Sequence, residues 1–388
     1  MEIRELRADE REAAFYLGSQ AFMNGSRDMS RMDHPDRLPR KTFGVWDSAG
    51  LQAMVGVIEY QIHLGAEATV PMGGIAAVAC LPASRGKGYA GQCLKYALEQ
   101  MRESGQAVST LFPFSFDYYD RFGWAWVGVQ RTYEVKTRAL KAAPETEDAR
   151  AATESDRPAI AMAYTEFAKR YRGALVRNEK LWNQVLNNGD KEYRYTYLYE
   201  KAGQVEGYLT YKGGNREGTK LREFIALTPR ARRALLGLLR RHEMQIEKFT
   251  WDAPSDDPLW STLMHWDLTT KAEPTTQARI VDIPTAIAAW RPDPGASGRT
   301  VLQVQDSCAP WNQGTWQIEF ADGESRAVRT DSAAQISLDI RALSQAYFGM
   351  PTVSELRAAD KLTIHDESGY RALKDLFAGP PTWMSDSF

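Results

Sequence analysis

The sequence has few of the residues that cross-link secreted proteins and no segment suited to a bilayer. Its 388 residues contain three cysteines, Cys80, Cys93 and Cys308, and none forms a CxxC pair. Three thiols cannot build a disulfide framework, which favours a reducing compartment. No apolar run reaches the ~20 residues that span a membrane, and the charged start Met1–Glu5 lacks the apolar stretch of a signal peptide. We therefore expect a cytoplasmic protein with no membrane partner.

An excess of basic residues is also absent. Lys and Arg total 48 against 50 Asp and Glu, which gives a net charge of −2. Nucleic-acid binding requires a basic stripe, so no nucleic-acid partner is expected. The five histidines form no HExxH or other catalytic spacing, and we expect neither a bound metal nor a catalytic histidine.

What is present is the composition of a multidomain globular protein. Hydrophobic residues make up 43% and charged residues 25% of the chain, and 388 residues exceed one ordinary core. The apolar pattern breaks near 141–155 and near 271–277. These breaks predict domains at 1–143, 144–274 and 275–388. The expected fold class is α/β (α+β), with two tandem mixed-sheet domains and a small C-terminal α+β domain.

The first two domains show the same order of elements. Met54–Tyr60 is similar to Gln204–Thr210, and Val78–Ala83 is similar to Ile225–Arg230. In the first copy, the strand is followed by two glycines and a helix. The second copy has no glycine after its proline, so we expect a duplicated domain that has lost a ligand-binding loop.

That loop carries the clearest chemical signal. A predicted strand, Gly73–Leu81, leads into a helix predicted over Tyr89–Glu103. The connection matches the pattern Arg/Gln-x-x-Gly-x-Gly/Ala, with the residues Arg85, Gly86, Lys87, Gly88, Tyr89 and Ala90. Glycines let successive backbone N–H groups point inward, and the helix N-terminus adds partial positive charge. The predicted ligand is a pyrophosphate, although the hexapeptide alone also fits a turn that binds nothing.

A second motif makes a family resemblance specific. The stretch from Tyr119 to Trp124, Tyr-Asp-Arg-Phe-Gly-Trp, closely resembles the Tyr-x-(Arg/Lys)-x-Gly-Phe/Tyr segment of GNAT acetyltransferases. The layout of two such halves and a small third domain resembles the enhanced intracellular survival (Eis) proteins, whose third domain is similar to a sterol carrier protein. Residues 309–316 and 342–349 carry that last similarity.

The resemblance implies acetyl-CoA as co-substrate and a role for several residues. The backbone of Val78 and Cys80 would pair with the pantetheine arm, and a nearby N–H would stabilise the developing oxyanion. Tyr119 would protonate the departing thiolate, although an aromatic packing role is the alternative. The terminal carboxylate of Phe388 would be the base. A homo-oligomer, specifically a hexamer, is also implied.

Substrate contacts are less specific. Asp28, Asp33 and Asp36 are candidates for a cationic substrate, and Trp46 or Phe22 for an aromatic contact with it. Asp386 is a further candidate, because relatives can carry an acid at the position of Ser387. Solvated loop charges are the alternative for each aspartate.

The function expected is N-acetylation of primary amines on a small polycationic substrate, aminoglycoside-like or polyamine-like. Two alternatives stay open. One is acetylation of protein lysines or N-termini, and the other is an apolar-ligand carrier with a vestigial transferase.

Overall fold

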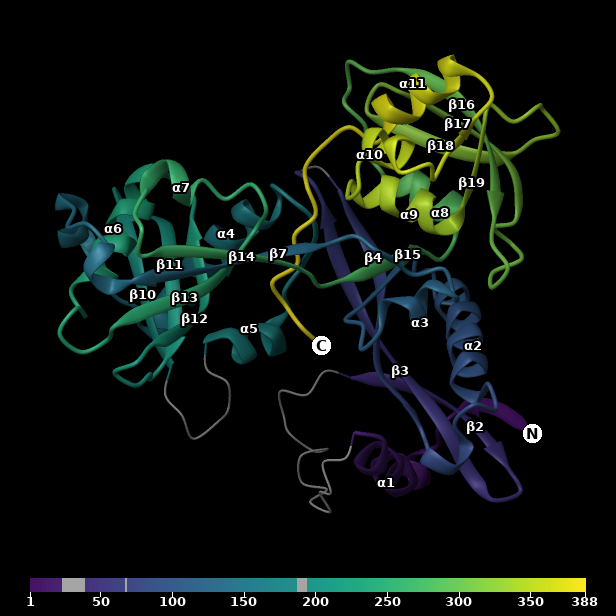
Figure 1. Cartoon of the computed structure of the whole chain (residues 1–388), viewed down its shortest axis with the longest axis horizontal. Coiled ribbons are helices and arrows are strands. Elements are labelled where there is room, and N and C mark those ends of the chain that lie inside the picture. Colours follow the sequence, from purple (N-terminus) through teal and green to yellow (C-terminus); the bar gives the residue numbers. More distant parts are fainter. Residues whose placement is uncertain (23–38, 67, 187–193) are drawn as a thin grey trace. The chain divides into compact units, whose positions relative to one another are not determined.

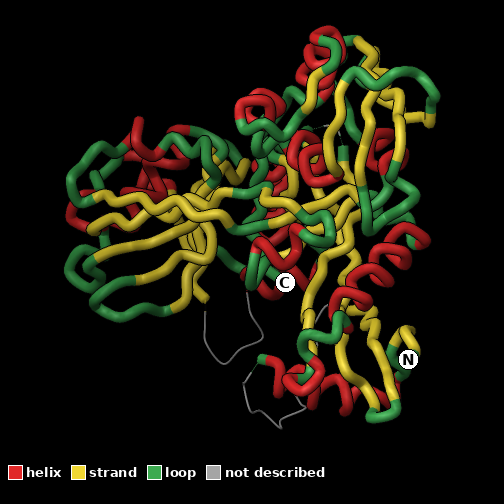
Figure 2. Tube along the Cα trace, turned by 45° about the vertical axis from the view of Figure 1, so that its right-hand side comes forward, coloured by secondary structure: helices red, strands yellow, loops and turns green. Residues whose placement is uncertain are grey.

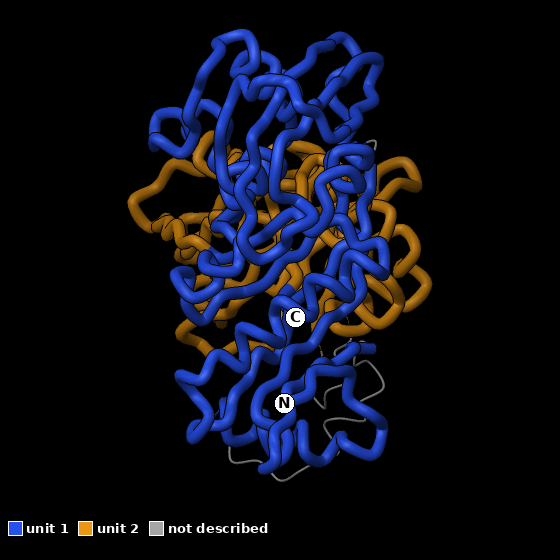
Figure 3. Tube along the Cα trace, turned by 90° about the vertical axis from the view of Figure 1, so that its right-hand side faces the viewer, with its two compact units in different colours: residues 1–128, 275–380, 387–388 blue, residues 129–274, 381–386 orange. Residues whose placement is uncertain are grey.

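The computed structural model describes residues 1–22, 39–66, 68–186 and 194–388. The chain divides into two compact units (Figure 3). Unit 1 holds residues 1–128, 275–380 and 387–388, and unit 2 holds residues 129–274 and 381–386. Both units contain helices and strands, which are drawn in red and yellow in Figure 2.

The N-terminal part of unit 1 is built around a mixed sheet (Figure 1). Its strand order is β1-β2-β3-β4-β5-β15-β6. The elements are β1 (Glu2–Glu5), η1 (Ala8–Glu10), α1 (Arg11–Ala21), β2 (Arg40–Asp47), β3 (Gly50–Leu64), β4 (Thr69–Cys80), η3 (Pro82–Ser84), α2 (Tyr89–Glu103), β5 (Val108–Leu111), α3 (Phe116–Asp120), β6 (Ala125–Trp126) and β15 (Gln277–Ile280).

Helices α1 and α2 cover different faces of this sheet. Side chains alternate along a strand, so Val55 and Val57 of β3 pack in the core that contains α2, whereas Met54 packs with α1. The bounds of α2 match the predicted helix, and its apolar residues Cys93, Leu94, Ala97, Leu98 and Met101 are buried. This core fixes the start of α2 next to the end of β4.

The third domain, also in unit 1, has its own sheet in the order β18-β17-β16-β19-β20. Its elements are α8 (Ile283–Ala289), β16 (Gly298–Gln305), β17 (Gly314–Ala321), β18 (Glu324–Arg329), β19 (Ile336–Asp339), α9 (Ile340–Phe348), α10 (Val353–Ala358), β20 (Thr363–Ile364) and α11 (Glu367–Leu376). Strands β17 and β18 form a hairpin that turns at Asp322 and Gly323, which both have positive φ, as a two-residue turn of this type requires.

Unit 2 contains a sheet in the order β14-β7-β13-β12-β11-β10-β8. Its elements are β7 (Val129–Lys136), η4 (Thr137–Ala139), η5 (Pro144–Asp148), β8 (Ala149–Ala151), η6 (Glu154–Asp156), α4 (Arg157–Ala168), β9 (Arg172–Leu175), α5 (Glu179–Leu186), β10 (Arg194–Lys201), β11 (Gln204–Lys212), β12 (Thr219–Ala226), α6 (Pro229–Arg240), β13 (Lys248–Ala253), α7 (Leu259–Thr262) and β14 (Leu268–Pro274).

The first domain boundary differs from the predicted residue 143. Strand β7 lies within the range predicted for the first domain, but it pairs with β13 and β14 inside unit 2. Conversely, β15 follows unit 2 in the sequence but pairs with β5 and β6 in unit 1. The contacts therefore separate at Gly128. The composition change near 141–155 falls inside unit 2, on η5, β8 and the start of η6. The true boundary was missed because pairing between strands more than 100 positions apart leaves no local signal in the sequence.

Candidate active site

Strand β4 is irregular where the sequence analysis expects the cofactor arm. Its register with β3 shifts between Ala76 and Ala79, and Ala77 has φ +50°, which only a bulge or a turn normally requires. Beyond this point β4 leaves its other neighbour, because its pairing with β5 ends at Ile75. The distal part of β4, from Ala76 to Cys80, thus lies beyond the end of β5 (Val108–Leu111) and has no paired strand on that side among the described residues.

The edge of β4 beyond the end of β5 leaves specific backbone groups without a strand partner. The amide of Leu81 donates to the Gln52 carbonyl at 2.9 Å, on the β3 side. Backbone groups of successive strand residues point to alternate edges. The N–H and C=O groups of Cys80 and Val78 therefore face the edge that β5 has left, where an extended chain can add as a further strand.

The loop after β4 has the geometry of an anion cradle. Gly86 and Gly88 have φ of +81° and +80°, and a Cβ at either would meet nothing within 4 Å. Gly88 is the N-cap of α2 and supplies no side-chain cap. The first amides of a helix have no intrahelical acceptor, and in α2 no capping side chain replaces it. The positive end of the helix dipole therefore points into open space.

A cavity of about 810 Å³ joins these features. Seven of the eight predicted cofactor contacts line it, and the eighth, Lys87, is exposed and outside the lining. The lining also includes three cationic side chains, Arg85, Lys95 and Arg121. The open edge, the uncapped helix and these charges together fit a ligand with an extended arm and phosphate groups. The full lining is Ala21, Phe22, Val78, Ala79, Cys80, Ser84, Arg85, Gly86, Gly88, Tyr89, Ala90, Gly91, Gln92, Lys95, Phe114, Tyr118, Arg121 and Phe122.

Sequence reasoning did not find Lys95, Phe114 or Arg121. Phe114 is an apolar ring left 70% exposed beside the cavity. Phe122 packs closely on α2, because a Cβ at Gly91 would stand 2.8 Å from its ring. That glycine lets α2 approach the Arg-Phe-Gly segment closely.

Tyr119 and Tyr118 lie in the short helix α3, which Ser115 caps by accepting from the Tyr118 amide. Tyr119 is 3% exposed and contacts Phe114 and Tyr118 edge-on, with ring centroids 5.3 Å and 5.1 Å away. Burial raises the pKa of its phenol above the ordinary value, so the group keeps its proton. Tyr118, rather than Tyr119, is a lining residue of the cavity.

Phe388 lies against the proximal half of β4. Its ring contacts Tyr60 of β3 at 4.9 Å and Phe112 at 5.4 Å between centroids. A Cβ at Gly74 would stand 2.6 Å from Cε2 of Phe388. Gly74 and Phe112 both adjoin the last β4–β5 pair, Ile75 with Leu111. The ring therefore packs where the two strands begin to separate.

The residues predicted to contact the substrate lie in different environments. Asp28 and Asp33, together with Asp36, lie outside the described residues. Trp46 is half-buried, and the guanidinium of Arg4 lies 3.9 Å from its ring centroid, so that face already holds a cation. Asp386 is 2% exposed and is ion-paired with Arg177 within unit 2. This burial favours an anchoring role over a substrate contact.

The corresponding region of unit 2 is closed. Helix α6 follows β12, but Thr228 caps it by accepting from the Ala231 amide at 3.2 Å. Strands β12 and β13 also diverge after a short parallel pairing, and Phe224 and Trp251 stack there with centroids 5.5 Å apart. A side chain thus occupies the helix N-terminus, and aromatic rings fill the core between the strands.

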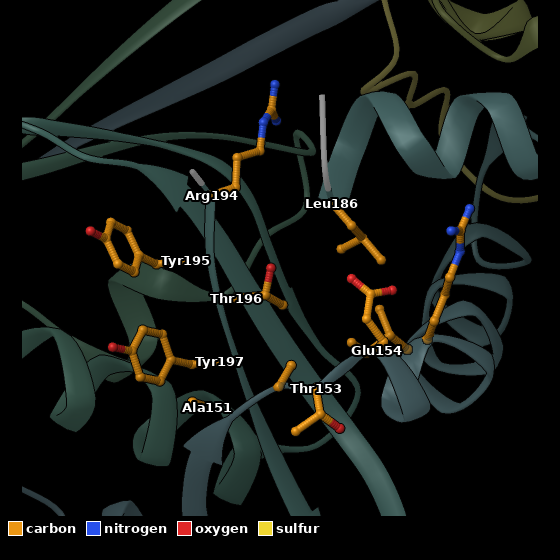
Figure 4. A pocket seen from close by; sticks show the side chains of 11 residues that line it. Ala151, Thr153, Glu154, Leu186, Arg194, Tyr195, Thr196 and Tyr197 are labelled. Atoms are coloured by element: carbon orange, nitrogen blue, oxygen red, sulfur yellow. The ribbon is translucent and has the colours of Figure 1, made fainter. Parts of the chain in front are cut away.

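Unit 2 has a smaller cavity of about 210 Å³ beside β8 and β10 (Figure 4). Thr153, Glu154, Thr196 and Leu186 are among its lining residues. The Thr196 hydroxyl donates to Thr210, and Thr153 belongs to a capping box with Asp156. These polar groups already have partners inside the protein, and we assign the cavity no ligand.

The described residues include no helix that is long and apolar enough to cross a bilayer. No group of three or more His, Cys, Asp or Glu side chains among them is arranged to hold a metal ion.

Comparison with known proteins supports the fold and the chemistry. Residues 2–127 and 173–280 each match an acetyltransferase (GNAT) domain, and residues 283–385 match a sterol carrier protein domain. The chain is 26% identical to the N-acetyltransferase Eis of Mycobacterium tuberculosis over 86% of both chains. It is 22% identical to an uncharacterized N-acetyltransferase of Streptomyces avermitilis over 83% of both.

Solved structures share the fold along the whole chain. A GCN5-related N-acetyltransferase from Anabaena variabilis superposes with a TM-score of 0.90 at 22% identity, covering 100% of both chains. Eis1 from Mycobacterium abscessus superposes with a TM-score of 0.82 at 22% identity, again over 100% of both. The expected order of two GNAT domains and a sterol-carrier-like domain is confirmed.

Proposed function

We propose that this chain, an N-acetyltransferase of the GNAT superfamily that resembles the Eis proteins, acetylates primary amines of a small polycationic substrate. The GNAT domains imply acetyl-CoA as co-substrate. The observation that carries the proposal is the packing of Phe388 on Gly74, which brings the carboxyl end of the chain to β4.

The proposed roles follow from the chemistry of the residues. Acetyl-CoA supplies an acyl group activated as a thioester. An ammonium substrate must lose a proton before it can attack, and the Phe388 carboxylate accepts that proton.

The remaining residues act on charge that develops during the reaction. The Val78 amide, on the open edge of β4, donates to the carbonyl oxygen as it becomes negative, a contact of a type worth ~3 kcal/mol. Tyr119 then gives its proton to the departing thiolate. A phenol suits this role because its ordinary pKa of about 10, raised further by burial, keeps it protonated at neutral pH.

The proposed cofactor contacts divide between arm and phosphates. Backbone groups of Val78 and Cys80 hold the extended arm, and the amides from Arg85 to Ala90 hold the pyrophosphate. Arg85 lines the cavity, whereas Lys87 is exposed, so we expect a larger contribution from Arg85. Lys95 and Arg121 add charge for a further phosphate.

The polycationic substrate class rests on acidic groups. The proposed base is itself an anion, and Asp28, Asp33 and Asp36 lie close together in the sequence. Release of CoA is to be measured with a panel of amines: polyamines, aminoglycosides, simple monoamines, a lysine peptide and a peptide with a free N-terminus. Preference in kcat/KM for polyamines or aminoglycosides over monoamines supports the proposal. Preference for either peptide would favour protein acetylation instead. Cytoplasmic location and a hexameric state stay predictions from the resemblance.

A further inference from the structure

The segment before Phe388 is fixed within unit 2 by its backbone. The Arg172 amide donates to the Pro381 carbonyl at 3.0 Å, and the Trp383 amide donates to the Arg172 carbonyl at 2.9 Å. The Trp383 ring belongs to the same buried cluster as Tyr164 and Trp182. The chain end is therefore held like an added strand, unlike an ordinary frayed terminus.

Asp386 adds a polar anchor to this segment. Its carboxylate accepts from Arg177 Nε at 3.0 Å, from Arg222 Nη2 at 3.2 Å and from the Tyr164 hydroxyl at 3.4 Å. Arg222 Nη1 also donates to the Ser385 carbonyl at 3.0 Å. The two arginines thus bind the Asp386 carboxylate, and Arg222 also binds the backbone carbonyl next to it.

The partners of Asp386 are themselves held in place. Arg177 is 1% exposed in its side chain and donates to Glu223 as well, and Glu223 accepts from the Tyr208 hydroxyl at 2.6 Å. Burial alone would lower the pKa of Arg177, but the charges of Asp386 and Glu223 outweigh it and the pKa is raised. Two cations, Arg177 and Arg222, balance the two carboxylates.

A buried network of this kind is a poor source of net stability, because desolvation offsets most of the attraction. It does, however, fix geometry, since each charge tolerates only one arrangement of its partners. Asp386 precedes Phe388 by two residues, which span at most ~7 Å. Fixing Asp386 consequently restricts where the terminal carboxylate can lie.

We infer that Arg177 and Arg222 are positioning residues for catalysis, which act by holding Asp386 and thereby the carboxylate of Phe388. This inference rests on the proposed role of that carboxylate as base. The second GNAT domain would then contribute to catalysis, because both arginines and Glu223 belong to it. The role predicted for Asp386 changes accordingly, from substrate contact to anchor.

The test compares Asp386→Asn with a matched control, Asp257→Asn. Asp257 forms another buried pair in unit 2, with Arg232 at 2.9 Å, and does not contact the chain end. Misplacement of a catalytic group by ~1 Å can cost ~10²-fold, so Asp386→Asn should lower kcat by ~10- to ~100-fold. The KM for acetyl-CoA should change little in either variant, and kcat should stay near wild type in Asp257→Asn.

Removing a buried charge can impair folding, so a milder variant accompanies it. The Arg222 side chain is 30% exposed, and Arg222→Gln keeps the core contact between Arg177 and Asp386. Thermal denaturation shows which variants are folded at the assay temperature. Like Asp386→Asn, Arg222→Gln should lower kcat, but it should leave the melting temperature nearly unchanged.

Repeating Asp386→Asn in a chain extended by two residues after Phe388 separates positioning from mere stability. If Asp386 acts through the carboxylate, its substitution should have no further effect on kcat once the extension has removed that carboxylate. If the two changes instead reduce kcat by the product of their separate effects, Asp386 has only a structural role and the inference is overturned. Wild-type kcat in Asp386→Asn, with an inactive extended chain, would also overturn it but leave the proposed base intact. Wild-type kcat in the extended chain would reject the base and the inference together.

Discussion

The ring of Phe388 lies so close to Gly74 that no side chain fits between them. A Cβ at Gly74 would stand 2.6 Å from Phe388 Cε2 and 2.8 Å from Tyr60 Cε2, inside the range that real contacts avoid. Glycine is needed here for close approach, since its φ is not among the positive ones. The pair connects β4, which carries the proposed oxyanion contact, with the residue that carries the proposed base.

Gly74→Ala should therefore displace Phe388 and lower kcat by ~10-fold or more, in line with the cost of a ~1 Å misplacement. The KM for acetyl-CoA should change less, because Gly74 is outside the cavity lining. Steady-state kinetics with a saturating amine measure both quantities. In a chain that lacks Phe388, Gly74→Ala should have no further effect on kcat. An equal loss in that background would mean that the alanine disturbs the sheet itself.

Tyr119→Phe should leave the affinity for acetyl-CoA nearly unchanged and reduce kcat by at least ~30-fold, because general acid catalysis contributes ~10²–10⁴-fold. Tyr118→Phe is the matched control, since it removes a hydroxyl from the neighbouring ring on the same helix. Because Tyr118 lines the cavity, its loss should affect the KM for acetyl-CoA more than kcat. The reverse pattern would identify Tyr118 as the acid.

The dependence of kcat on pH should also reflect the buried phenol. Burial raises the pKa of Tyr119, and the neutral form is the active acid. A raised pKa extends the active range upward, past the ordinary value of about 10. A pH profile with a saturating amine should thus rise with loss of the substrate proton and show no decline before about pH 10. A falling limb below that pH that disappears in Tyr119→Phe would contradict the raised pKa of Tyr119, although it would keep Tyr119 as the acid.

One acetyl-CoA should bind per chain, because Thr228 caps the helix of the second copy. Titration calorimetry measures this stoichiometry, and Gly88→Glu should abolish binding by placing bulk and negative charge in the phosphate cradle. Gly203→Glu is a matched control: Gly203 has φ +78° and equally open surroundings, but lies in a hairpin turn of unit 2. Two molecules per chain, or normal binding by Gly88→Glu, would refute the assignment of the loop.

Some of these features could be predicted because their signals are local. Helix α2 follows from the spacing of Cys93, Leu94, Ala97 and their neighbours, and the cradle follows from two glycines at its start. The hairpin at Asp322 likewise has a turn sequence of its own.

Other features depend on partners far apart in the sequence. β7 reads as the next strand of the first domain, but its pairing with β13 and β14 cannot be seen locally. Asp386 reads as an exposed acid near the chain end, because nothing in the tail indicates that Arg177, 209 positions earlier, neutralises it. Lys95 joins the cavity only through the direction that α2 gives it.

The most direct test of the proposed base is kcat for two variants of the last residue. Deleting Phe388 moves the terminal carboxylate back by about 3.5 Å, which exceeds the tolerance of a hydrogen bond. Adding two residues replaces that carboxylate at Phe388 with a neutral peptide bond. Either variant should lose at least ~30-fold in kcat while it stays folded and binds acetyl-CoA. Wild-type kcat in both would contradict the assignment of Phe388 as the base.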